Sequence, residues 1–292
     1  MHDNESLTAV FEAHRGRLRA VAYRMLGSVS EADDAVQEAW LRLNRADTGD
    51  VVNLGGWLTT VVARVCLNML RSRETRREEP LEERLPDPVV SRADGMDPEQ
   101  EALLADSVGF ALLVVLQRLE PTERLAFVLH DMFAVPFDEI AAVIGRTSAA
   151  TRQLASRARR RVRGAAGERP DPDLSRQRAA VEAFLAAARD GDFEALVAVL
   201  HPDVELRADS GPVMPWNELR GAITVAEQAV MFRKMYDYAF PVLVNGAAGV
   251  LLARNGRAFT VGALTVVDGR IRSVDILADP ARVAHLDVAA LT

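Results

Sequence analysis

The 292-residue sequence predicts a multidomain protein with two all-α domains followed by an α+β domain. Apolar residues recur at helical spacing from Leu7 to Arg77 and again from Glu99 to Arg163, which is the pattern of amphipathic helices. After Leu174, two helical segments give way to short β-type runs separated by Asn-Gly and Asp-Gly turns. The expected division is a domain at 1–77, a proline-rich acidic linker at 78–98, a domain at 99–163, a linker at 164–173 and a domain at 174–292.

Composition limits the classes of protein to consider. A content of 49% apolar and 26% charged residues describes a globular chain, and no apolar run approaches the roughly 20 residues of a membrane helix. The first residues lack the basic and apolar segments of a secretion signal. The one cysteine, Cys66, excludes an intramolecular disulfide and a cysteine-rich zinc site. We therefore expect a cytoplasmic location, no membrane contact, no metal and no cofactor.

The segment from Ser30 is expected to form a helix with one acidic face. Ser30-Glu31-Ala32-Asp33 has the pattern of a capping box, which marks a helix start. Apolar residues at helical spacing predict its buried stripe: Ala32, Ala35, Val36, Ala39, Trp40 and Leu43. The outward stripe consists of Asp34, Gln37, Glu38 and Leu41. Such a face is typical of a solvent-exposed helix, and Leu41 within it also suits a docking surface.

The next helix is expected to begin near Gly55-Gly56-Trp57 and to carry a basic face. One side combines an aromatic ring, an amide and guanidinium groups: Trp57, Arg64, Asn68 and Arg71, extended by Arg73, Arg76 and Arg77. Aromatic rings stack on unpaired bases and arginines bind phosphates, so this face suits melted DNA. The same pattern also fits a core tryptophan followed by a basic helix end, which the helix dipole favours.

Residues 137–163 have the pattern of a helix-turn-helix. A short helix ending at Gly145 and a turn at Arg146-Thr147-Ser148 precede a long basic helix from Ala149 to Arg163. We expect Ala150, Leu154 and Ala158 to pack inward. The residues expected to face the major groove are Ser148, Thr151, Arg152, Ser156 and Arg157, with Arg160 in a phosphate-binding tail.

Local charge supports this helix-turn-helix although the chain as a whole carries a net charge of −7. Seven arginines lie between residues 146 and 163 with no Asp or Glu among them. They would repel one another unless an anion is near. An ordinary helical hairpin with a basic tail is the alternative.

These segments, in this order, resemble the two conserved domains of the extracytoplasmic-function sigma factors, the specificity subunits of bacterial RNA polymerase. The similarity covers residues 7–163 and rests on Ala32–Leu41, Gly56–Arg64 with Asn68–Arg77, and Thr151–Arg160. It implies a sigma-2 domain that binds core polymerase through Asp33, Asp34, Gln37, Glu38 and Leu41. It implies recognition of the minus-ten box by Trp57, Arg64, Asn68, Arg71, Arg73 and Arg76. It implies a sigma-4 domain that reads the minus-thirty-five box through Ser148, Thr151, Arg152, Ser156, Arg157 and Arg160.

The C-terminal part is similar to the SnoaL-type, NTF2-like cone domain found on a subset of these factors. Leu85-Pro86-Asp87-Pro88 matches the linker motif of that subset. The glycine-rich loop of the subset is replaced by Asp209-Ser210-Gly211-Pro212, and a late motif is matched only loosely by Ala278–Val283. The resemblance implies a regulatory role for Asp209, Gly211, Asp279 and Pro280. It also implies that no separate anti-sigma factor is required.

The resulting prediction is a transcription initiation factor that carries out no chemistry. Its C-terminal domain is expected to act on the linker or on the DNA-binding domains and to set their spacing. Catalysis would require a carboxylate base and a group that stabilises an enolate, and Asp209, Tyr236 and Tyr238 show no convergent pattern. A small-molecule ligand of the cone domain stays open. The alternatives are a ligand-responsive helix-turn-helix regulator that acts without polymerase, and an NTF2-like enzyme fused to a DNA anchor.

Overall fold

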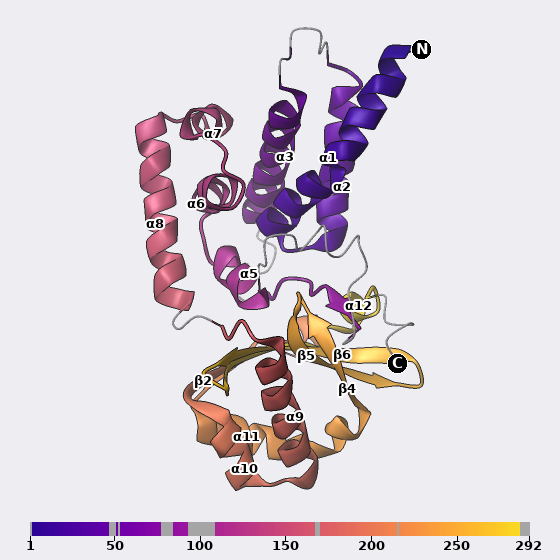
Figure 1. The fold of residues 1–292 in the computed structure, drawn as a ribbon, viewed down its shortest axis with the longest axis vertical. Helices are drawn as coiled ribbons and strands as arrows, with labels where there is room; N and C mark the ends of the chain where they lie inside the picture. The colour runs from indigo at the N-terminus through magenta and orange to yellow at the C-terminus, as the bar shows by residue number, and fades with distance from the viewer. Residues whose placement is uncertain are drawn as a thin grey trace. The chain divides into compact units, whose positions relative to one another are not determined.

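The structure is a computed structural model that describes residues 2–46, 51, 53–76, 84–92, 109–166, 170–214 and 216–286 (Figure 1). The chain forms two compact units. The first contains Met1–Glu82, Pro98–Asp106 and Leu112–Ala166, and the second contains Glu83–Asp97, Ser107–Ala111 and Gly167–Thr292. Apart from Ser107–Ala111, both predicted helical domains therefore belong to the first unit, whereas the first predicted linker belongs mostly to the second. The predicted order, helical regions followed by an α+β domain, is confirmed.

The N-terminal part of the first unit is a three-helix bundle. It consists of α1 (His2–Leu26), α2 (Val29–Leu43) and α3 (Leu54–Arg76), which pack side by side (Figure 1). Leu18, Leu43 and Leu58 are fully buried between them. The helix α2 begins before the predicted capping box, because its N-cap is Ser28, whose side chain makes no cap hydrogen bond. The Ser30 hydroxyl contacts the Ser28 hydroxyl instead, so the capping-box prediction was wrong.

The C-terminal part of the first unit contains the predicted helix-turn-helix. Its elements are α5 (Phe110–Gln117), α6 (Pro121–Phe127), the π-helix η2 (Val128–Met132), α7 (Phe137–Ile144) and α8 (Ser148–Ala166). Gly145 adopts a left-handed conformation with a φ of 72°, and its N–H donates to Ala141 O to end α7. The predicted helix-turn-helix is therefore present, with its turn at residues 145–147 in place of 146–148, and both α6 and α7 pack against α8.

In the second unit, α9 (Leu174–Asp190), α10 (Phe193–Val199) and α11 (Ala222–Met231) cover one face of a curved sheet (Figure 1). Seven strands of the described residues form this sheet in the order β1-β4-β5-β6-β7-β2-β3. They are β1 (Val90–Ser91), β2 (Leu200–Asp209), β3 (Asn217–Arg220), β4 (Ala239–Val244), β5 (Ala247–Arg254), β6 (Arg257–Val267) and β7 (Arg270–Leu277).

The β-type runs that the Asn-Gly and Asp-Gly turns separate are confirmed as strands: β4 to β7 pair as an antiparallel meander. The turns Asn245-Gly246, Asn255-Gly256 and Asp268-Gly269 have positive φ at both residues, as two-residue hairpin turns require. The strand β3 and the helix α11 were not predicted. A further unpredicted strand, β1, comes from the linker and pairs antiparallel with β4 at the edge of the sheet.

Candidate polymerase and DNA interfaces

The acidic stripe of α2 is presented to solvent. Asp34 and Gln37 are exposed, and Leu41 has 41% of its surface exposed, while Ala32, Ala35 and Ala39 on the opposite side are fully buried. Two carboxylates of this helix are engaged within the protein: Glu38 of the stripe pairs with Arg42 at 2.8 Å, and Asp33 beside the stripe pairs with Arg19 at 2.6 Å. The stripe therefore keeps one carboxylate, one amide and one leucine available for a partner.

The basic face of α3 is formed by Arg64, Asn68 and Arg71, which are exposed and share one side of the helix with the half-buried Trp57. Arg64 donates from Nη2 to Ala142 O on α7 over 3.2 Å. Thus a residue expected to bind the minus-ten box lies against the helix-turn-helix.

Arg73 was wrongly assigned to this face. It lies on the opposite side of α3, because two residues beyond Arg71 correspond to a rotation of about 200° around a helix. There it pairs with Glu31 of α2, and only 14% of its side chain is exposed. The side chain of Arg76 lies outside the described residues, so its predicted role is untested.

The inward face of α8 also differs from the prediction. Thr151, Ala155 and Ala158 are fully buried, whereas Ala150 and Leu154 are only partly covered. The Thr151 hydroxyl donates to Thr147 O over 3.0 Å. The Thr151 side chain therefore lies on the inward side of α8. It cannot reach the major groove, contrary to the prediction. The hydroxyl of Ser148, at the start of α8, donates to Asp138 of α7.

The arginines of α8 find carboxylates on neighbouring elements. Arg157 and Arg161 each pair with one oxygen of Glu123 on α6, at 2.9 and 3.0 Å. Arg159 pairs with Asp131 of η2 at 2.5 Å. The predicted mutual repulsion of unopposed arginines is thus partly relieved within the fold, because acidic groups distant in sequence lie beside the helix.

The linker is bound to the C-terminal domain by a buried polar cluster. The N–H of Leu85 donates to Asp209 Oδ2 over 2.9 Å. Arg282 donates to the same Asp209 oxygen at 2.6 Å, to Leu85 O at 2.6 Å and, from Nε, to Asp87 Oδ1 at 2.8 Å. Four residues later in the linker, Val89 exchanges two hydrogen bonds with Asn245, of 3.0 and 2.8 Å. Together with β1, these contacts hold Leu85 to Ser91 on the sheet.

The predicted regulatory residues surround this cluster. Gly211, the first residue of the 3₁₀ turn η3 (Gly211–Val213), donates its N–H to Asp209 Oδ1 over 3.1 Å. The Asp279 carboxylate accepts the Ala281 N–H over 2.9 Å and so caps α12 (Pro280–Val283), the helix that carries Arg282. The structure thus brings Asp209, Gly211 and Asp279 together, with the exposed Pro280 beside them.

Sequence reasoning assigned no role to Arg282 or Asn245. Arg282 lies within the loosely matched motif at Ala278–Val283, but the pattern gave no reason to single it out. Asn245 was selected only as a turn residue. Their partners Asp87 and Val89 are 195 and 156 residues away in the chain.

Comparison with known proteins agrees with this geometry. The model of Sigma-70 region 2 matches residues 10–76, and the model of Sigma-70 region 4 matches residues 109–162. The chain is 41% identical to the ECF RNA polymerase sigma factor SigJ of Mycobacterium tuberculosis over 92% of this chain and 91% of that protein. The chain belongs to the extracytoplasmic-function RNA polymerase sigma factors.

Two further similarities support this membership. The probable ECF sigma factor SigI of M. tuberculosis is 34% identical over 96% of both chains. The crystal structure of M. tuberculosis SigJ matches with a TM-score of 0.77 and 37% identity over 96% of this chain and 99% of that one. The predicted function, a sigma factor in transcription initiation, is confirmed. The alternative of a helix-turn-helix regulator unrelated to polymerase is therefore set aside.

In the C-terminal domain of this sigma factor, two of the candidate catalytic groups, Asp209 and Tyr236, lie on opposite faces of the sheet. On β2, Leu206 and Ala208 pack toward the helices, so Asp209 lies on the other face of the sheet and is occupied by Leu85 and Arg282. Tyr236 contacts Phe184 of α9 edge-on, with ring centroids 5.9 Å apart. Burial raises the pKa of Tyr236 to about 12, which makes its phenol a poor source of protons.

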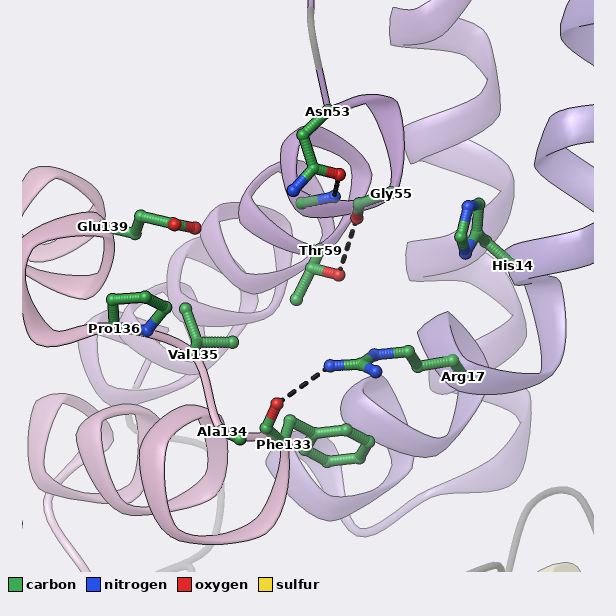
Figure 2. A pocket seen from close by; sticks show the side chains of 11 residues that line it. His14, Arg17, Asn53, Gly55, Thr59, Phe133, Ala134, Val135, Pro136 and Glu139 are labelled. Atoms are coloured by element: carbon green, nitrogen blue, oxygen red, sulfur yellow. Dashed lines mark hydrogen bonds between the residues drawn. The ribbon is translucent and has the colours of Figure 1, made fainter.

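A cavity of about 260 Å³ opens in the first unit of this sigma factor, between α1, the start of α3 and the loop after η2 (Figure 2). Arg17 reaches across it and donates to Phe133 O over 2.8 Å. Asn53 accepts the Gly56 N–H and Thr59 donates to Gly55 O, both at 2.9 Å. Arg17, Asn53 and Thr59 on its wall are thus engaged with backbone groups, and the cavity contains none of the predicted site residues.

Neither a membrane segment nor a metal site is apparent in the part of the chain that the structure describes. Its helices are too short or too polar to cross a membrane. Its His, Cys, Asp and Glu side chains form no group that could hold a metal ion.

Proposed function

We propose that this sigma factor binds core RNA polymerase through the α2 stripe and promoter DNA through α3 and α8, and that its C-terminal domain restrains it through the linker. It acts in the cytoplasm and carries out no catalysis. The observation that carries the regulatory part is the binding of Leu85 and Asp87 by Arg282. The polymerase and DNA partners follow from the family and from the exposed faces of α2, α3 and α8.

The α2 stripe is suited to a protein partner because it combines a charge and an amide with an exposed leucine. Such mixed surfaces bury the apolar group at the centre and leave the polar groups at the rim. We expect the double variant Asp34→Ala/Leu41→Ala to weaken binding to core polymerase. Glu12→Ala, which removes an exposed carboxylate of α1 paired with Arg15, is the matched control. Equal affinity of the two variants would refute the assignment.

The restraint follows from the distance between the two promoter boxes. Boxes centred near positions minus ten and minus thirty-five are about 25 base pairs apart, or about 85 Å at 3.4 Å per base pair. In the first unit, Arg64 of the minus-ten face touches Ala142 of the helix-turn-helix. The two DNA-binding faces must therefore separate before both boxes can be bound. A linker fixed on the C-terminal domain limits that separation, because its residues cannot extend between the two faces.

In vitro transcription with core polymerase tests the restraint. Arg282→Gln removes the cation that holds the linker, and we expect more transcript from a cognate promoter. Chains ending at Arg163 and at Leu277 complete the series, since the first lacks the C-terminal domain and the second lacks α12 with Arg282. Asn255→Ala, at an exposed turn of the C-terminal domain, serves as the control. Unchanged activity of all three altered chains would exclude regulation through the linker.

Because the C-terminal domain is part of the same chain, its effective concentration at the linker is high. Restraint by this domain therefore makes a separate anti-sigma factor unnecessary. The response to Arg282→Gln is then expected with only the purified chain, core polymerase and promoter DNA present. A small-molecule ligand of the cone domain stays a prediction. Native mass spectrometry of the purified chain measures whether one is bound.

A further inference from the structure

We propose that Gln153 reads a base of the upstream promoter box and that Arg157, chosen from the sequence pattern, does not. This inference rests on the proposed function, in which α8 enters the major groove. It concerns which side chains of α8 determine sequence preference.

The packing of α8 determines which side faces away from the protein. Thr151, Ala155 and Ala158 are fully buried and define the inward side. Since each residue of a helix is rotated by about 100° from the last, Gln153 lies about 200° from Thr151 and therefore almost opposite to it. Gln153 and Ser156 are both exposed. They lie on the side of α8 that faces away from the protein. The sequence pattern had assigned Thr151 to that side.

The position and chemistry of Gln153 suit base recognition. It lies in the second turn of α8, and recognition helices contact base edges through residues near their N-terminus. Its amide makes no hydrogen bond to any described residue, so both its donor and its acceptor are available. A glutamine amide matches adenine in the major groove, where it accepts from N6–H and donates to N7. The expected target is an A·T base pair.

Some arginines of α8 bind carboxylates of the protein, and others are available to DNA. Glu123 has only 6% of its side chain exposed, and its two oxygens hold Arg157 and Arg161. Moving either arginine to a base would leave a buried carboxylate with less compensation, which is unfavourable. Arg152 and Arg160 are exposed, and Arg152 lies over the Phe137 ring at 5.6 Å. Gln153 is thus left to select the base, with Arg152 beside it and Arg160 available for a phosphate.

Binding of the holoenzyme to a promoter series, with each base pair of the upstream box replaced in turn, tests the proposal. Gln153→Ala should bind the native box about 5- to 150-fold more weakly, the usual range for one bidentate base contact. The loss should disappear when one particular A·T pair is replaced. Gln153→Glu, which accepts but cannot donate, should shift the preference at that pair toward cytosine. Both substitutions lie at an exposed site, and thermal unfolding verifies that the fold is kept.

Two arginine variants serve as controls. Arg160→Ala should weaken binding to every sequence equally and lower the slope of log affinity against log salt concentration by about 0.9. Arg161→Ala should leave the base preferences intact. If wild-type holoenzyme ignores the upstream box, the proposed function fails. If it reads the box while Gln153→Ala keeps every base preference, or loses affinity uniformly, the role of Gln153 is refuted and that of α8 is not.

Discussion

Arg282 and Asp209 form a 2.6 Å ion pair between residues 73 positions apart, and only 12% and 7% of their side chains are exposed. The same guanidinium binds Asp87 and the carbonyl of Leu85. One cation thus joins the linker motif to the loop at Asp209 and to α12. Two carboxylates and one carbonyl compensate its charge, so its removal takes the cation away from both carboxylates and a donor away from the Leu85 carbonyl.

Replacing Arg282 by Gln should therefore destabilise the linker site. We expect the free energy of unfolding to fall by about 3 kcal/mol, the usual cost of breaking a buried ion pair. The Leu85 amide should also exchange with solvent faster, because its acceptor Asp209 loses its cation. Arg220→Gln is the control, since Arg220 pairs with Glu218 while 67% of its side chain is exposed. Exposed pairs contribute about 0–1 kcal/mol. Equal urea midpoints for the two variants would contradict the prediction.

Gly211→Ala should also disrupt the site. Gly211 has a φ of 61°, which an alanine adopts at a cost of roughly 1 kcal/mol. A Cβ at this position would lie 2.6 Å from the Asp279 carboxyl carbon, so Asp279 must leave its capping position, which costs about another 1 kcal/mol. Gly256 has a similar φ of 72°, but a Cβ there would have no atom within 4 Å. The variant Gly256→Ala therefore measures the cost of the backbone conformation alone. Urea unfolding should show the larger loss for Gly211→Ala; equal losses would count against the packing argument.

The success of the sequence predictions depended on how local each feature is. Hairpin turns such as Asn245-Gly246 were predicted correctly, because two adjacent residues determine the backbone conformation. Arg73 and Thr151 were placed on the wrong helix faces, since a small error in helical phase moves a side chain by 100° or more. Alanines made the phase of α8 ambiguous: Ala150, Ala155 and Ala158 are alike in the pattern, and only packing against α6 and α7 distinguishes them.

Non-local features could not be predicted. The linker strand β1 depends on β4, whose residues lie about 150 positions later in the chain. The role of Glu123 in holding Arg157 and Arg161 arises only when α6 packs against α8. No spacing rule within one segment contains this information.

In the first unit, Arg124→Met should be strongly destabilising. Arg124 is 1% exposed and donates to Met25 O near the end of α1 over 2.8 Å and to Gln117 O at the end of α5 over 2.6 Å. Methionine fills a similar volume but leaves these carbonyls without their charged donor. We expect a loss of about 2–4 kcal/mol. Arg146→Met, at an exposed turn, should change stability by about 0.5 kcal/mol or less, and urea unfolding compares the two.

Tyr236 should make the stability of the C-terminal domain fall at high pH. Burial raises its pKa in the folded state from 10.0 to about 12, so the folded protein favours the neutral phenol. The stability that this preference provides is fully present below pH 10, where the phenol is neutral in both the folded and the unfolded state. It is lost as the pH rises toward 12. Two pKa units correspond to about 3 kcal/mol, discounted somewhat for the partial exposure of the ring.

The comparison of wild type with Tyr236→Phe isolates this effect. Cys66, whose pKa is also raised by burial, is present in both proteins, so its contribution cancels. The difference in unfolding free energy between the two should be constant from pH 7 to 9. Between pH 10 and 12 it should change in favour of Tyr236→Phe, because phenylalanine has no proton to lose. Parallel stability curves up to pH 12 would show that the phenol reaches solvent in the folded protein.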